Sequence, residues 1–260
     1  MNYIDTFKLK RDTPDVRDIL FKAEKLKVDK IILPVSFNLQ LTKLLPSVLN
    51  QGQLGSCGPN QISNCLRYCL KKLKTSPEFQ PSRLYIYYFA RLLDEAPLDS
   101  DTGISIRTGL KVISHYGACS EDNWGYNISK FTQKPSDSAI LAGKTHIPGY
   151  KYIRVPQNLI NIKQSLVGGF PIICGILLYS SFVSDNVSKT GIVPLPNTSQ
   201  EECLGGHCVS IVGYNDTLKT FTLMNSWGTG WGNKGFFTLP YDYIMNNQIA
   251  FDFWIITYFK

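Results

Sequence analysis

Apolar residues in the first half of the chain recur at helical spacing. Between positions 59 and 74 they lie three and four residues apart, which predicts a helix with one buried face. Pro59 suits the first turn of this helix, because the N–H that proline lacks would have no partner there. A second helix, rich in Tyr and Leu, is expected over about 82–93, and a third over about 104–115, before Gly117.

Beyond about residue 145 the pattern changes to short apolar runs separated by Gly, Asn, Asp and Pro, which is typical of strands. Five runs are expected to be strands: 172–178, 209–212, 221–224, 235–239 and 253–258. The chain therefore divides into a mainly helical part over about 50–145 and a mainly β part over about 146–258, an α+β organisation. A cleft between two such parts is a common place for an active site.

Residues 1–32 form a charged extension that precedes a more apolar sequence beginning at Leu33. The extension has no apolar core of signal-peptide length, and the chain has no apolar run of the roughly 18 residues that a membrane span needs. We therefore expect no secretion by that route and no membrane partner. The expected location is intracellular, or virion-associated if the source is a large DNA virus.

The net charge of +7 is modest and spread along the chain. Its densest basic group, Lys71, Lys72 and Lys74, falls at the end of the first predicted helix, where cations suit the helix dipole. A solvated helix end is the usual role of such a group, and no nucleic-acid-binding motif accompanies it. We therefore expect no nucleic-acid partner.

Seven cysteines are present, an odd count that does not suggest a disulfide framework in a chain without a signal. Most are expected to be small apolar core residues, among them Cys65 and Cys69, one helical turn apart on the apolar face of the first helix. The run Cys203-x3-His207-Cys208 has no second pair of ligand-type residues at a suitable spacing, so we expect no metal and no cofactor. Two other histidines without such spacing are expected to be surface or structural residues: His115 and His146.

Three separated segments carry residue types that together supply a nucleophile, a base and a group to orient the base. They read Gln51-Gly52-Gln53-Leu54-Gly55-Ser56-Cys57, Gly206-His207-Cys208 and Asn225-Ser226-Trp227-Gly228. Cys57 stands at the start of the first predicted helix, whose N-terminus stabilises a thiolate. A histidine within hydrogen-bond reach would complete the ion pair and later protonate the leaving group. A cysteine alone is more often buried and unreactive, so the assignment depends on its partners.

These segments resemble the active-site motifs of the papain-like cysteine proteases. His207 lies 150 positions after Cys57 (207 − 57), and Asn225 lies 18 positions further on (225 − 207). The first separation agrees with the roughly 130–150 residues typical of the family, and the segment 225–232 matches the family's Asn motif almost letter for letter. Five further segments resemble the signal-free branch of the family, found in bacteria, archaea and large viruses: 11–18, 81–88, 101–107, 191–195 and 252–254.

The resemblance, which covers about residues 33–258, implies a papain-like two-lobed fold. A helical N-terminal lobe would face an antiparallel β-barrel-like C-terminal lobe, with the active site in the cleft between them. Residues 33–260 would form the peptidase domain, and residues 1–32 would be either a short inhibitory pro-segment or a tether on the outside of the fold. The chain would be a cysteine endopeptidase acting on proteins or peptides, and we expect a monomer.

The resemblance also implies a role for each matching residue. Cys57 would attack the scissile carbonyl and form a thioester, His207 would be the general acid and base, and Asn225 would orient the imidazole. Gln51 and the backbone N–H of Cys57 would form the oxyanion hole. Four residues would bind substrate: Gly103 through its backbone, Gly206 beside the base, Trp227 on the leaving-group side, and Asp252 at the floor of the main specificity pocket. For Asp252, a surface position between two aromatic residues is an equal alternative.

The sequence departs from the family pattern in three places. Gly58 follows the nucleophile, where the family usually has an aromatic residue. Leu54 and Asp101 occupy positions at which secreted relatives carry a disulfide, and this agrees with the missing signal. The long pro-domain of the family has no counterpart among the residues before Leu33.

The choice between functions rests on the same residues. The paired-His loop of the carboxydipeptidase relatives has no counterpart, which favours an endopeptidase over an exopeptidase. Two other functions stay open: a catalytically inactive papain-fold protein used for binding or assembly, and an acyl transferase that uses the same triad. The intact set Cys57, His207, Asn225 and Gln51 argues against the inactive protein.

Overall fold

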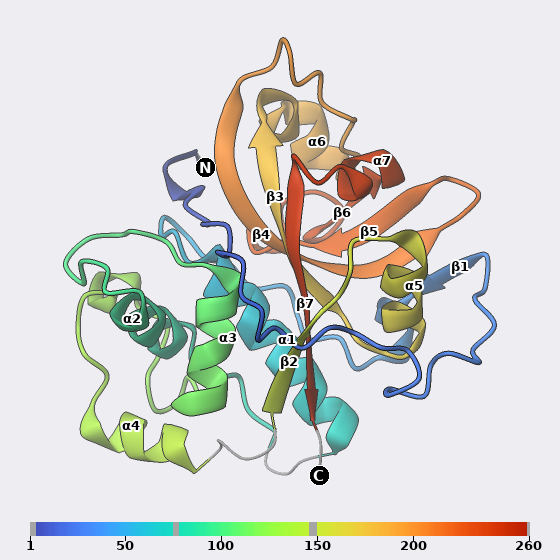
Figure 1. Cartoon of the computed structure of the whole chain (residues 1–260). Helices are drawn as coiled ribbons and strands as arrows, with labels where there is room; N and C mark the ends of the chain where they lie inside the picture. Colours follow the sequence, from blue (N-terminus) through green and yellow to red (C-terminus); the bar gives the residue numbers. More distant parts are fainter. Residues whose placement is uncertain (1–3, 75–77, 146–149, 259–260) are drawn as a thin grey trace.

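The computed structural model describes residues 4–74, 78–145 and 150–258 (Figure 1), so the expectation about His146 lies outside the described residues. One side of the molecule is helical and consists of α1 (Cys57–Leu73), α2 (Arg83–Leu93), α3 (Ile106–His115) and α4 (Asp137–Lys144). The first three are the helices expected from the apolar spacing, although α1 begins at Cys57, two residues before Pro59. Within the described ranges, no helix has the length and apolar character needed to cross a membrane.

The other side is built on an antiparallel sheet with the strand order β2-β7-β3-β4-β5-β6, and β1 pairs with β4 off this path. The strands are β1 (Ser36–Asn38), β2 (Tyr150–Arg154), β3 (Ile172–Tyr179), β4 (Cys203–Asn215), β5 (Thr220–Met224), β6 (Phe236–Pro240) and β7 (Ala250–Tyr258). Three short helices accompany the sheet: α5 (Leu159–Val167), α6 (Asp185–Thr190) and α7 (Tyr241–Met245). All five expected strands are present, and the α+β class with one helical and one β half is confirmed.

Helix α1 is the element that joins the two halves. It packs against α2 and α3 on one side and against β3, β4 and β7 on the other, and its residues are buried without a break from Cys57 to Leu66. The N-cap residue Ser56 makes no capping hydrogen bond, and its hydroxyl is instead 2.5 Å from the Tyr126 hydroxyl. The first N–H groups of α1 therefore keep no side-chain partner at the cap, and they remain available to Cys57.

The cysteines confirm the expectation of small core residues. Six of the seven are buried, and Cys203 on β4 is exposed. The Cys65 sulfur lies 3.3 Å from the Ser210 hydroxyl, so this thiol packs in the interface between α1 and the sheet. Burial raises the pKa of Cys65 to about 12, which keeps it a neutral thiol at physiological pH.

Arg91 on α2 is fully buried and holds the loop between α2 and α3. Its guanidinium donates to the backbone carbonyls of Leu98 at 3.1 Å and Ser100 at 2.9 Å, and also to that of Phe131. Hydrogen bonds from a charged donor contribute roughly 1.5–3 kcal/mol each, more than neutral ones. This loop continues to Gly103, so the buried cation helps to fix the segment that carries this glycine.

We expect Arg91→Met to lower the free energy of unfolding by about 3 kcal/mol, because it leaves three buried or partly buried carbonyl groups without a charged donor. Chemical denaturation followed by tryptophan fluorescence measures the change. Lys144→Met, at the exposed end of α4, is the control and should leave the midpoint unchanged. Equal midpoints for the two variants would mean that the loop is held in another way.

Candidate active site

Cys57 is the first residue of α1, and the loop that precedes it is tied to both halves of the molecule. The Gln51 N–H donates to the Ser226 carbonyl at 2.8 Å, and the Gly55 N–H donates to the Asp101 carboxylate at 2.9 Å. The backbone N–H groups of Cys208 and Gly58 lie near the sulfur and oppose the rise of its pKa. The candidate nucleophile thus lies at a helix N-terminus, in a loop tied to both halves.

His207 on β4 is oriented by Asn225, which follows β5. The imidazole Nε2 donates to Asn225 Oδ1 at 2.8 Å, and the Ser226 N–H donates to the same oxygen at 2.8 Å. Because this amide oxygen only accepts, Nε2 carries the proton and Nδ1 is left as the basic atom. Within the described residues, Nδ1 has no hydrogen-bond partner, so it makes no hydrogen bond to the Cys57 sulfur.

Both reactive groups are buried, and burial sets their protonation. Cys57 is 1% exposed and His207 is 0% exposed. Burial raises the pKa of Cys57 to about 11, although the surrounding backbone N–H groups oppose this. Burial also lowers the pKa of His207 to about 4, against the effect of the Asn225 hydrogen bond. In this structure the pair is therefore a neutral thiol and a neutral imidazole at pH 7.

The Gln51 side chain is fully buried and held at both ends. Its Oε1 accepts from the Ser226 hydroxyl at 2.7 Å, and its Nε2 donates to the Leu54 carbonyl at 2.9 Å. An amide nitrogen carries two protons, so one N–H of Gln51 remains beyond the bond to Leu54. The fixed amide orientation leaves a donor next to the Cys57 loop.

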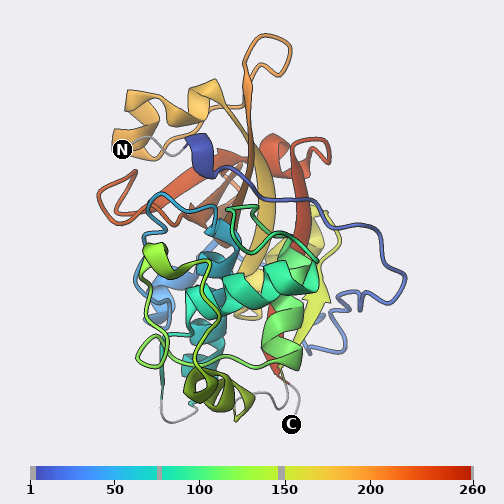
Figure 2. The same cartoon turned by 90° about the vertical axis from the view of Figure 1, so that its left-hand side faces the viewer.

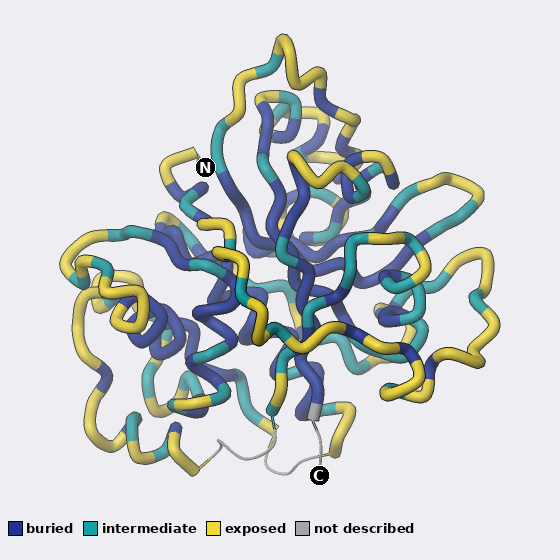
Figure 3. The backbone as a smooth tube through the Cα atoms, viewed as in Figure 1, coloured by how far each residue is buried: buried dark blue, intermediate teal, exposed yellow. Residues whose placement is uncertain are grey.

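The N-terminal extension passes where the helical half meets the β half (Figure 2). The Leu9 N–H donates to the Gly206 carbonyl at 3.1 Å, and the Lys10 N–H donates to the Ile104 carbonyl at 3.1 Å. These two bonds join the extension to β4 on one side and to the segment before α3 on the other. Figure 3 shows a mostly exposed or half-buried extension lying over buried elements.

The side chains of the extension cover the site directly. The Phe7 ring stacks on Trp227 with centroids 5.8 Å apart, and it meets the His207 ring edge-on at 5.9 Å. Leu9 belongs to the same buried apolar cluster as Cys57 and Phe251. Trp227 itself lies 5.0 Å from the His207 ring. The extension therefore excludes water from the two reactive groups.

Two of the expected substrate-binding residues, Gly103 and Gly206, touch the extension backbone. A Cβ on Gly103, which has a φ of +66°, would lie 1.9 Å from the Lys8 carbonyl oxygen. A Cβ on Gly206 would lie 2.4 Å from the Leu9 carbonyl oxygen. Only glycine allows a chain to approach this closely at either position.

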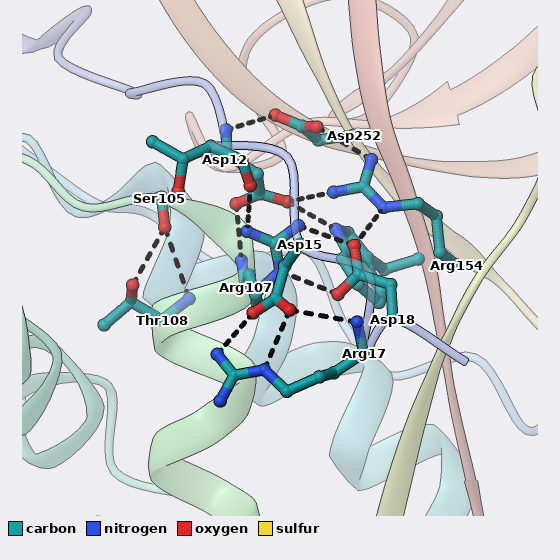
Figure 4. A network of polar contacts seen from close by, with 11 residues as sticks. Asp12, Asp15, Arg17, Asp18, Ser105, Arg107, Thr108, Arg154 and Asp252 are labelled. Atoms are coloured by element: carbon teal, nitrogen blue, oxygen red, sulfur yellow. Dashed lines mark hydrogen bonds and ion pairs between the residues drawn. The ribbon is translucent and has the colours of Figure 1, made fainter. Parts of the chain in front are cut away.

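Asp252 lies in an ion-pair network that holds the next part of the extension (Figure 4). Its carboxylate accepts from Arg154 at 2.9 Å and from the Asp12 N–H at 2.7 Å. Arg154 also pairs with Asp12 at 2.9 Å and with Asp18 at 2.8 Å, while Arg107 pairs with Asp18. The role of Asp252 in substrate binding stays a prediction, because in this structure its carboxylate is bonded to the extension.

The ionised form of Asp12 is stabilised by several donors but is deeply buried. Besides Arg154, it accepts from the Trp254 indole at 2.8 Å and from the Arg107 N–H at 3.0 Å. Burial and the nearby charge of Asp252 raise the pKa of Asp12 above its usual value. Sequence reasoning assigned no role to this network, and the only signal was the resemblance of residues 11–18 to an extension motif.

Comparisons with known proteins agree with this geometry. The family model described as papain family cysteine protease matches residues 98–252. An uncharacterised peptidase C1-like protein of Acanthamoeba polyphaga mimivirus is 39% identical over 266 residues, which cover 95% of this chain and 85% of that protein.

Solved structures of cysteine proteases have the same fold as this chain. Xylellain, a cysteine protease from Xylella fastidiosa, superposes with a TM-score of 0.89 at 33% identity, covering 100% of this chain and 98% of that one. Procathepsin B S9 from Trypanosoma congolense has a TM-score of 0.75 at 14% identity, covering 98% and 86%, and shares the fold. The chain therefore belongs to the papain family of cysteine proteases and is a cysteine-type peptidase.

Proposed function

We propose that the chain is a cysteine endopeptidase in which Cys57, His207, Asn225 and Gln51 carry the chemistry. The observation that carries the proposal is the hydrogen bond between His207 Nε2 and Asn225 Oδ1, which leaves Nδ1 as the basic atom of the imidazole. With water admitted to the cleft, the imidazole can take the thiol proton, and the N-terminus of α1 stabilises the resulting thiolate.

The reaction would proceed in two steps through a thioester. The Cys57 thiolate attacks the scissile carbonyl, and His207 gives its proton to the leaving amine. Water, deprotonated by His207, then releases the acyl group from Cys57. The free N–H of Gln51 and the backbone N–H of Cys57 would hold the oxyanion, each donor being worth about 3–4 kcal/mol.

The extension would act as an inhibitory segment rather than as an outer tether. It fills the cleft, bonds to both halves and keeps the reactive pair neutral. Its chain passes Trp227 at Phe7 and reaches Asp252 at Asp12. A substrate with its leaving group at Trp227 would run the opposite way, which explains how the extension can occupy the site without being cut.

We expect a thiol-directed epoxide inhibitor to modify Cys57 and Cys57→Ala to abolish peptide hydrolysis. Peptide mapping by mass spectrometry locates the adduct. Cys203→Ala is the matched control, because Cys203 is the exposed thiol among the seven and should be dispensable for activity. Modification of another cysteine with Cys57 untouched would contradict the assigned nucleophile.

Loss of the two buried anchors of the extension should raise activity. We expect Phe7→Ala combined with Leu9→Ala to increase kcat/KM of the full chain by about a hundredfold or more, since each buried apolar side chain contributes about 1.5–3 kcal/mol to closure and about 1.4 kcal/mol corresponds to a factor of ten. A fluorogenic peptide assay measures the gain, and Lys10→Ala, at an exposed position, is the control. An unchanged rate in the double variant would argue for a tether without inhibitory effect.

The same pair of proteins gives a pH dependence. Burial raises the pKa of Cys57 to about 11 in the closed form, so its contribution to closure is complete below the pKa of the uncovered thiol. That contribution is lost as the pH rises toward about 11. The ratio of kcat/KM between the double variant and the wild type should therefore shrink, by up to about tenfold per pH unit above the pKa of the uncovered thiol. A ratio that stays constant from pH 7 to about 10 would show that closure does not depend on the Cys57 proton.

A further inference from the structure

Asp101, at a position where secreted relatives carry a disulfide cysteine, forms a polar link between two parts of the active-site cleft. Its Oδ2 accepts from the Gly55 N–H at 2.9 Å, two residues before Cys57. Its Oδ1 accepts from the Tyr87 hydroxyl, and that hydroxyl accepts from the Gly103 N–H at 3.0 Å. The carboxylate is thus fixed between the loop of the nucleophile and the glycine expected to pair with substrate.

Gly55 and Gly103 leave room for the Lys8 side chain beside this carboxylate, and we call the space that Lys8 fills there the slot. A Cβ on Gly55 would lie 2.9 Å from Asp101 Oδ1 and 3.2 Å from the Lys8 Cδ. On the other side, a Cβ on Gly103 would meet the Lys8 carbonyl. Lys8 therefore fills the slot with its aliphatic stem, and its ammonium reaches Asp101 Oδ2 at 3.1 Å.

The slot is occupied by Lys8, whose neighbours Phe7 and Leu9 pack at the candidate active site. Phe7 lies against His207 and Trp227, and Leu9 lies in the apolar cluster that contains Cys57. Lys8 lies between these two residues in the sequence, and its side chain lies beside Gly55 in the loop before Cys57. A substrate residue whose carbonyl lies at Cys57 would begin its side chain at the same place, beside Gly55.

The charge balance of the slot depends on Lys8. Within the described residues, Lys8 is the cation within ion-pair distance of Asp101, whose side chain is 17% exposed. Arg91 is the next cation felt by Asp101, but its guanidinium is directed to backbone carbonyls. When the extension leaves, a fixed and partly buried carboxylate loses its counter-ion, and such a group favours a replacement cation.

We propose that Asp101 is a specificity-determining residue that selects Lys or Arg on the acyl side of the cleaved bond. This rests on the proposed peptidase function and on release of the extension. The slot accepts a long aliphatic stem, as Lys8 shows, and ends at a carboxylate that can bind an ammonium or a guanidinium. A neutral side chain of similar length would leave the carboxylate unpaired, and it would bind less well.

A bound cation would also assist the chemistry. Burial does most to raise the pKa of the Cys57 thiol, and the negative charge of Asp101 adds to the rise. A substrate cation at Asp101 offsets that charge and so favours the thiolate. The cationic side chain would therefore improve reaction at Cys57 in addition to binding.

Internal competition between peptides that differ in this one residue tests the proposal on the full chain. Peptides with Lys, Arg, Gln or Met before the cleaved bond compete in one mixture, and mass spectrometry gives the ratios of kcat/KM. Every peptide needs the same uncovered form, so the fraction of closed molecules cancels from each ratio. We expect the wild type to prefer Lys and Arg over Gln and Met by about tenfold or more.

Two variants of the same loop distinguish the charge of Asp101 from the charge of its surroundings. Asp101→Asn should bring the ratio close to one, and Asp101→Glu should restore a preference for cations. Asp99→Asn, which removes an exposed carboxylate two residues away, should keep the wild-type ratio. A cation preference that survives Asp101→Asn would overturn the proposal.

The wild-type measurement can overturn the proposal without any variant. Ratios near one, with all peptides hydrolysed, would reject Asp101 as a specificity residue and leave the proposed peptidase function intact. Failure to hydrolyse any peptide, with Cys57 unmodified by the epoxide in both the wild type and the Phe7→Ala, Leu9→Ala variant, would reject the proposed endopeptidase function and the specificity with it.

Discussion

Two consecutive backbone N–H groups of the extension, those of Leu9 and Lys10, bond to opposite halves of the molecule. This pairing closes the cleft, and several other properties depend on it. It places Phe7 over His207 and Trp227, so that the reactive groups are dry. Dryness, in turn, favours the neutral forms of both Cys57 and His207, because charged groups lose most when water is removed.

The ion-pair network of Figure 4 fixes the position of the extension along the site. Arg154 contacts Asp12, Asp18 and Asp252, and Arg107 makes paired hydrogen bonds with Asp18. The groups belong to the extension, α3, β2 and β7, and two guanidinium groups are shared among three carboxylates. Buried ion pairs add little net stability, but the loss of one partner is costly. A shift of the extension by one residue would leave such charges unpaired, so the network specifies position more than it adds strength.

The sequence predicted the parts of the fold that have a clear period or a motif. Helices α1, α2 and α3 have apolar residues at helical spacing, so the sequence predicted them. The proposed nucleophile, base and orienting residue lie in segments that resemble a family motif. Strand β4 was predicted only over 209–212, because Gly205 and Gly206 interrupt its apolar pattern. β2, with a half-exposed mixture of Tyr, Lys and Arg, and the very short β1 carry no such pattern.

The contacts that set the state of the site could not be found in the same way. Asp12 and Arg154 are 142 positions apart, and Arg107 and Asp18 are 89 apart, so each looks like an ordinary surface charge in the sequence. The sequence marked Asp101 as a lost disulfide position in a segment that resembles the family, but not that its carboxylate joins Gly55 to Tyr87 through hydrogen bonds. Charge pairing over such separations depends on the tertiary fold, which no local pattern encodes.

The later part of the extension, from Phe21 onward, is packed into the β half and limits which residues can leave the site. Phe21, Ala23 and Val28 are buried in the core of the β half, so the chain beyond Leu20 belongs to the folded body. In the proposed inhibitory role, the stretch before Phe21 would be the part that leaves the site, while the chain from Phe21 onward stays folded into the β half. Its return is then a first-order event whose rate does not fall on dilution. The time for which the site stays uncovered would be set by the length and stiffness of this attached segment. The extension would therefore rebind after each release without a partner protein.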